Sequence, residues 1–123
     1  MLSRSIETKW FRVFYDDSDC NLIEKVATLI DDTYDHTVKQ FELKTDNLKY
    51  KFMLCPSRAS FKELTGKSDD EYEDWMVGNE NYEKRTLCIL SPNVVDDRSL
   101  DDMLAVIKHE IIHIAFDQLQ KRE

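Results

Sequence analysis

The order of apolar and polar residues along the first half of the chain predicts a strand, a helix and a second strand. Residues 10–15 are aromatic and β-branched, which is typical of a strand. Over residues 21–41 the apolar positions recur every three or four residues, the period of a helix with one buried face. Residues 49–55 return to alternation of apolar and polar residues, which predicts the second strand.

The second half of the chain predicts a short helix, a third strand and a long final helix. Ser57 begins the short helix and Gly66 ends it, because serine caps helix N-termini and glycine tolerates the left-handed conformation that follows a helix. An apolar run over residues 86–90 predicts the third strand. The final helix is expected over about residues 100–120, and the capping serine Ser99 begins it.

This order of elements predicts the α+β class, a layered sheet with helices packed on it. The connection between the first two strands contains a whole helix, and a crossover of that length makes the two strands parallel. Gly78 and Asn79 are typical of a further turn. The acidic residues 67–74 are expected to form a solvated loop.

Length and charge narrow the classes of function. With 123 residues, of which 41% are hydrophobic, the chain is expected to form one domain with one core. Its 17 basic and 25 acidic residues give a net charge of −8. That charge repels phosphate backbones and anionic membrane surfaces, so neither a nucleic acid nor a membrane is an expected partner. No segment approaches the roughly 20 apolar residues that a transmembrane helix needs.

The three cysteines are Cys20, Cys55 and Cys88. Their odd number and wide spacing are unlike a disulfide framework or a zinc ribbon. We therefore expect reduced thiols that pack as small apolar side chains. The first fifteen residues lack the apolar stretch of a secretory signal, which favours a cytoplasmic localisation.

The final predicted helix carries a His-Glu-Ile-Ile-His segment, an HExxH motif, at residues 109–113. Residues four apart lie on one face of a helix, one turn from each other, so His109 and His113 can bind one Zn²⁺ at about 2.0–2.1 Å each. Glu110 lies about 100° around the helix, beside the metal rather than on it, where it can take a proton from a metal-activated water. The motif therefore predicts a zinc cofactor, His109 and His113 as metal ligands, and Glu110 as the catalytic base.

The same helix is apolar on nearly all sides, which is typical of a helix in the middle of a molecule. Three apolar residues extend toward the histidine side: Ile112, Phe116 and Leu119. No later predicted element covers them, so self-association through this uncovered face is expected. Asp32 and His36, four apart on the first helix, are most simply a surface pair.

Taken together, these features resemble the catalytic upper half of a gluzincin-type (peptidase MA-like) zinc metallopeptidase, a protease and hydrolase, with the minigluzincins closest in size. The resemblance covers roughly residues 10–117. It is carried by the HEIIH segment within residues 104–116, by the strand Thr86–Leu90 with Ser91 and Pro92, and by Phe61, Gly66, Trp75 and Gly78 before it. It implies a single-domain, zincin-like upper half: a small mixed sheet with an antiparallel edge strand, packed with helices and ending in the HExxH active-site helix. Residues 1–123 would then be the N-terminal, catalytic-helix domain of such an enzyme, incomplete at its C-terminus.

The resemblance also assigns a substrate-binding strand. In the family an antiparallel edge strand precedes the active-site helix and pairs with an extended peptide or protein substrate. By resemblance this would be Thr86, Leu87, Cys88, Ile89 and Leu90. An open edge accepts an added strand on physical grounds as well. An ordinary edge strand facing solvent is the equally weighted alternative.

The third zinc ligand departs from the family pattern. A gluzincin supplies a glutamate from a later helix, whereas the metzincin position six residues after His113 is Leu119. Asp117 and Glu123 are the remaining candidates, and both are poorly placed to reach a metal between the two histidines. We therefore expect residues 1–123 alone to fold but to cleave little or nothing. The alternatives are a non-catalytic zincin-fold remnant acting as a binding or regulatory module, and another HExxH class of cytoplasmic protease.

Overall fold

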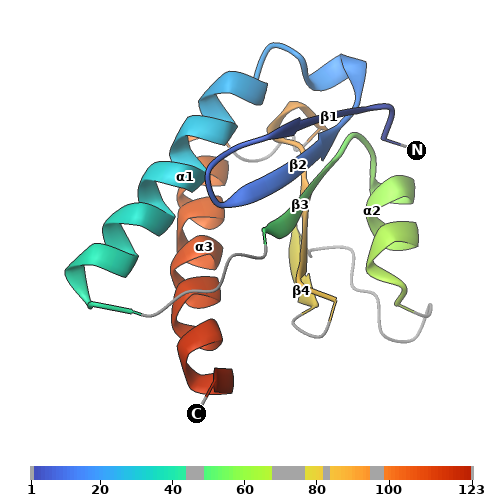
Figure 1. Cartoon of the computed structure of the whole chain (residues 1–123). Helices are drawn as coiled ribbons and strands as arrows, with labels where there is room; N and C mark the ends of the chain where they lie inside the picture. The colour runs from blue at the N-terminus through green and yellow to red at the C-terminus, as the bar shows by residue number, and fades with distance from the viewer. Residues whose placement is uncertain (1, 44–48, 68–76, 82–83, 95–98, 123) are drawn as a thin grey trace.

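The computed structural model describes residues 2–43, 49–67, 77–81, 84–94 and 99–122, and of residues 117–122 it describes the backbone alone. The chain is an α+β protein in which five strands of the described residues form one mixed sheet (Figure 1). The strands are β1 (Arg4–Glu7), β2 (Phe11–Tyr15), β3 (Tyr50–Cys55), β4 (Gly78–Asn81) and β5 (Thr86–Leu90), in the spatial order β1-β2-β3-β5-β4. Within the part of the chain that is described, no helix combines the length and apolar character needed to span a bilayer.

The inner strands β2, β3 and β5 are parallel, and the two outer strands run antiparallel to their neighbours. The predicted parallel pairing of the first two strands is therefore confirmed, because α1 (Ile23–Gln40) makes the crossover between β2 and β3. The short helix α2 (Arg58–Thr65) joins β3 to the β4–β5 part of the sheet. The last element is the long helix α3 (Leu100–Arg122).

The helices α1 and α3 pack side by side on one face of the sheet, while α2 lies on the other face (Figure 1). Along each strand, successive side chains point alternately to one face of the sheet and to the other. Phe52 and Ile89 join the core under α1 and α3, which also contains Ile30, Ile107 and Ile111. All five side chains are fully buried, and each contributes about 1.5–3 kcal/mol to folding.

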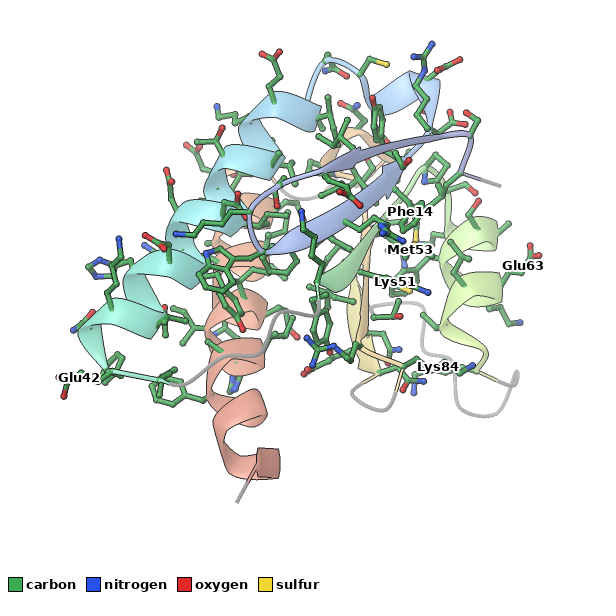
Figure 2. The ribbon with its side chains drawn as sticks, in the orientation of Figure 1. Phe14, Glu42, Lys51, Met53, Glu63 and Lys84 are labelled. Atoms are coloured by element: carbon green, nitrogen blue, oxygen red, sulfur yellow. The ribbon has the colours of Figure 1, made fainter. Side chains whose placement is uncertain are left out.

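The opposite face has a smaller core that α2 covers through Phe61. Cys55 and Cys88 are buried here, as expected, whereas Cys20 is exposed. A hydrogen bond to Cys88, together with burial, raises the pKa of the Cys55 thiol. Near β2 the side chains on this face are less buried. Phe14 and its register partner Met53 are half-buried and lie next to each other (Figure 2).

The two predicted capping serines, Ser57 and Ser99, are confirmed by their hydrogen bonds. The hydroxyl of Ser57 accepts a hydrogen bond from the Ser60 backbone at 3.1 Å, and that of Ser99 accepts one from Asp102 at 3.1 Å. Gly66 ends α2 with a φ of 71°, the left-handed conformation that glycine adopts without strain. The helix expected from residue 21 begins two residues later, at Ile23, after a short 3₁₀ turn at Asp17–Asp19.

The sequence interpretation of the sheet edges is also wrong. Thr86–Leu90, expected to be the antiparallel edge strand, is the inner strand β5, paired in parallel with β3 and antiparallel with β4. The edge is β4, in a segment interpreted as a turn from Gly78 and Asn79. The other edge, β1, was not predicted. The predicted acidic loop 67–74 lies, except for residue 67, outside the described residues.

Candidate metal centre

The two histidines of the HExxH segment converge on one point outside α3. Their Nε2 atoms are 3.0 Å apart, and their ring centroids are 4.4 Å apart with the planes at 81°. Both residues are exposed, whereas Ile107, Ile111 and Ile114 of the same helix are fully buried in the core. The one-turn spacing therefore places the two nitrogens together on the solvent side of the helix.

This distance fits two ligands of one zinc ion. Two nitrogens at about 2.0–2.1 Å from a tetrahedral Zn²⁺ are about 3.3 Å from each other. A small rotation of either imidazole ring would lengthen the distance between the two Nε2 atoms from 3.0 Å to that value. The same distance also fits a hydrogen bond between two neutral imidazoles, so a shared proton and a metal compete for the same pair of nitrogens.

Glu110 lies to one side of this pair, toward the sheet. Glu110 is half-buried, and its side chain lies near Gly78 of the edge strand β4. A Cβ atom added to Gly78 would be 4.0 Å from Glu110 Cγ and 3.0 Å from Ile89 Cδ1. The missing Cβ therefore leaves room for the Ile89 side chain of β5, whereas 4.0 Å to Glu110 Cγ is an ordinary contact distance that places the glutamate beside this part of β4.

Among the described residues, the strand β4 is paired on one side only. It pairs with β5 from Gly78 opposite Ile89 to Asn81 opposite Thr86, and no strand of the described residues pairs with its other side. The hydroxyl of Tyr50 donates a hydrogen bond to Glu80 Oε2 at 2.9 Å, which ties the strand to the interior of the sheet. An open, anchored strand beside a glutamate is an arrangement that accepts an extended peptide.

The other residues considered for metal binding are Asp32, His36, Asp117 and Glu123. Asp32 and His36 are exposed on α1 and line an open depression on that helix, as expected of a surface pair. Asp117 and Glu123 lie outside the residues whose side chains are described, so their role as third ligand stays a prediction. Among the side chains that are described, no group of three or more His, Cys, Asp or Glu could hold a metal.

Apolar side chains flank the histidines on the side away from β4. Ile112, half-buried, lines a groove of about 280 Å³ between α1 and α3 together with Leu29 and Lys108. One turn beyond it, the Phe116 ring lies 5.0 Å from that of Phe41, measured between centroids. Two of the three residues expected on the uncovered face are thus half-buried, while the side chain of Leu119 is outside the description.

Sequence reasoning did not anticipate that Glu110 would lie beside β4. The available signal was Gly78, one of only two glycines in the chain. A glycine inside a strand often marks a close approach of another element, but here it was interpreted as a turn residue.

No protein-family model, curated protein or solved structure matches this chain. Function must therefore be inferred from the side chains of α3 and β4.

Proposed function

We propose that this chain is the zinc-binding, catalytic-helix part of a metallopeptidase with a zincin-like fold, which hydrolyses peptide bonds. The observation that carries the proposal is the convergence of His109 Nε2 and His113 Nε2 at 3.0 Å, with Glu110 beside them over the open strand β4. When bound, zinc supplies Lewis-acid chemistry, since it lowers the pKa of a water and polarises a peptide carbonyl.

Each residue of the motif has a separate role in this proposal. His109 and His113 hold the metal through the two converging nitrogens. Glu110 points elsewhere around the helix, so its carboxylate is free to accept the proton of the attacking water and to pass it to the leaving amine. Its half-buried place against Gly78 limits the side-chain motion that would misdirect this proton transfer.

The substrate is proposed to bind as an added strand on β4. The resemblance to gluzincins assigned this role to residues 86–90, but β5 has β3 on one side and β4 on the other, so its backbone groups are already paired. The open side of β4 leaves backbone groups available to an extended peptide. Such a peptide would lie on the strand beside which Glu110 is placed, near Gly78.

The first test is zinc uptake, because it needs no substrate. We expect the chain to bind Zn²⁺ and the His109→Ala variant to bind it much more weakly. The chain contains three histidines, and the third, His36, is exposed on α1, so His36→Ala is a matched control that should bind zinc like the wild type. Equal zinc uptake by all three proteins in calorimetric titrations would refute the metal site.

The second test separates the peptidase from a binding module. Glu110→Gln should keep zinc binding nearly unchanged and abolish any hydrolysis of casein, because glutamine keeps the shape of glutamate but accepts no proton. We expect residues 1–123 to be weakly active or inactive by themselves, since only two ligands meet at the site among the side chains that are described. Zinc and peptide binding with no hydrolysis in any natural form of the protein would favour the non-catalytic binding or regulatory module instead.

A further inference from the structure

The metal-binding face of α3 is open to a second protein molecule. His109 and His113 are both exposed, and their converging nitrogens lie on the side of the helix opposite the core residues Met103 and Ile107. A zinc ion held there would sit outside the helix surface. Its coordination positions not filled by these two nitrogens would face away from the molecule.

Zinc sites in proteins favour four ligands in a tetrahedron. Among the side chains that the structure describes, only the two histidines meet at this point. A two-fold axis through the metal would supply the same two nitrogens from a second copy, because a two-fold interface brings identical surfaces together. Two copies would then complete a four-histidine site without any further ligand.

The surface around the histidines suits contact between two copies. Phe41 is 51% exposed, and its ring packs against Phe116, one turn beyond His113 on α3. Ile112, beside the histidines, is half-buried. Apolar side chains at the edge of a shared metal site lose contact with water when the two surfaces meet, which favours association.

The charge of the chain opposes the same contact unless a cation is present. Each copy carries a net charge of −8, so two copies repel one another in the absence of metal. A divalent cation between the two α3 helices offsets part of this repulsion. Association through this face should therefore depend on zinc.

We propose that two copies of this chain share one Zn²⁺ through His109 and His113 of each copy, forming a zinc-dependent dimer. This inference rests on the zinc site of the proposed function and adds its regulation. Four imidazoles leave no coordination position for a water or a peptide carbonyl, and the second copy covers Glu110 and the approach to β4. The dimer is accordingly a closed, inactive form of the site, and dilution or chelation releases the open form.

The experiment measures the mass of the particle and its zinc content together. Sedimentation velocity of the purified chain is recorded with EDTA and with added Zn²⁺ for the wild type, His109→Ala and His36→Ala. We expect a monomer in EDTA and a dimer containing one zinc per two chains after zinc addition. The dimer should be lost in His109→Ala and kept in His36→Ala, whose substituted side chain is exposed on another helix.

Each other outcome is decisive. A monomer that binds one zinc per chain overturns the shared site and leaves the proposed peptidase site standing. A dimer that persists in EDTA, or in His109→Ala, overturns the zinc bridge, because another surface then holds the copies together. A monomer that takes up no zinc overturns both the dimer and the proposed function.

Discussion

A buried polar cluster joins the 3₁₀ turn before α1 to the residues that follow β5, and Ser91→Ala tests what it contributes to stability. Asp19 is 1% exposed and Ser91 is fully buried, and the Ser91 hydroxyl donates a hydrogen bond to Asp19 Oδ1. The side-chain amide of Asn93 donates a second bond to the same oxygen at 3.1 Å. The other carboxylate oxygen, Oδ2, is buried and has no partner among the described residues. Asp19 therefore depends on few donors to compensate for its burial.

The cost of Ser91→Ala follows from this shortage of donors. A hydrogen bond to a charged group contributes about 1.5–3 kcal/mol, and a buried carboxylate that loses a donor cannot replace it with water at no cost. Stabilities of single domains are about 5–15 kcal/mol, so the variant should lose a large fraction of the total. The melting temperature should fall by roughly 5–15 °C.

Urea denaturation followed by circular dichroism measures this effect, with Ser5→Ala as the matched control. Ser5 lies exposed on β1, and its replacement should change the free energy of unfolding by less than about 0.5 kcal/mol. Adding Asp19→Asn to Ser91→Ala should recover part of the loss, because the amide oxygen still accepts from Asn93 while the buried charge is gone. A cost below about 0.5 kcal/mol for Ser91→Ala would refute the reasoning.

Three further predictions test the rest of the fold. A hydrogen bond from Lys39, and then one from Lys9, lowers the pKa of Asp35 to about 2. The stabilisation by this carboxylate is therefore present above its unfolded pKa of 3.8 and is lost as the pH falls toward 2. Lys39→Gln should raise the pKa of Asp35 in a carboxyl NMR titration. Ile111→Ala should cost about 2–5 kcal/mol, because the side chain is fully buried between α3 and the sheet, and a loss under about 1 kcal/mol by denaturation would contradict that packing. Asp31→Ala should lower the free energy of unfolding by about 1–3 kcal/mol. The Asp31 carboxylate accepts hydrogen bonds from Thr8 Oγ1 at 2.7 Å and from two backbone N–H groups of the β1–β2 turn. Unchanged hydrogen exchange in that turn would show that the carboxylate does not hold it.

Long periodic segments could be predicted well from the sequence, and the reason is local. The strand at residues 86–90 and the helix beginning at residue 100 have the predicted bounds at those positions. Their periodicity records which side of each element is buried, and that information is contained within a few turns or pleats. The convergence of His109 and His113 is local in the same sense, because one helical turn brings residues four apart together.

The outer strands could not be predicted, because pairing with a neighbour makes them strands. The segment Gly-Asn-Glu-Asn at 78–81 has residues that are rare in strands, and it becomes β4 through its hydrogen bonds with β5. β1 forms in the same way by pairing with β2, next to a turn that Asp31 holds from α1. No pattern within four residues reports a partner that lies elsewhere in the chain.

For the candidate site, the sequence by itself determined the spacing of the two imidazoles, and the tertiary structure decided what surrounds them. Residue identity and helical spacing are enough to bring two imidazole nitrogens together and to set Glu110 apart from them. Which strand lies beside Glu110 depends on the order of the strands in the sheet and on how closely α3 approaches β4 at Gly78. Both are set by hydrogen bonds and packing between segments distant in sequence, so the open strand at this site is β4 rather than β5.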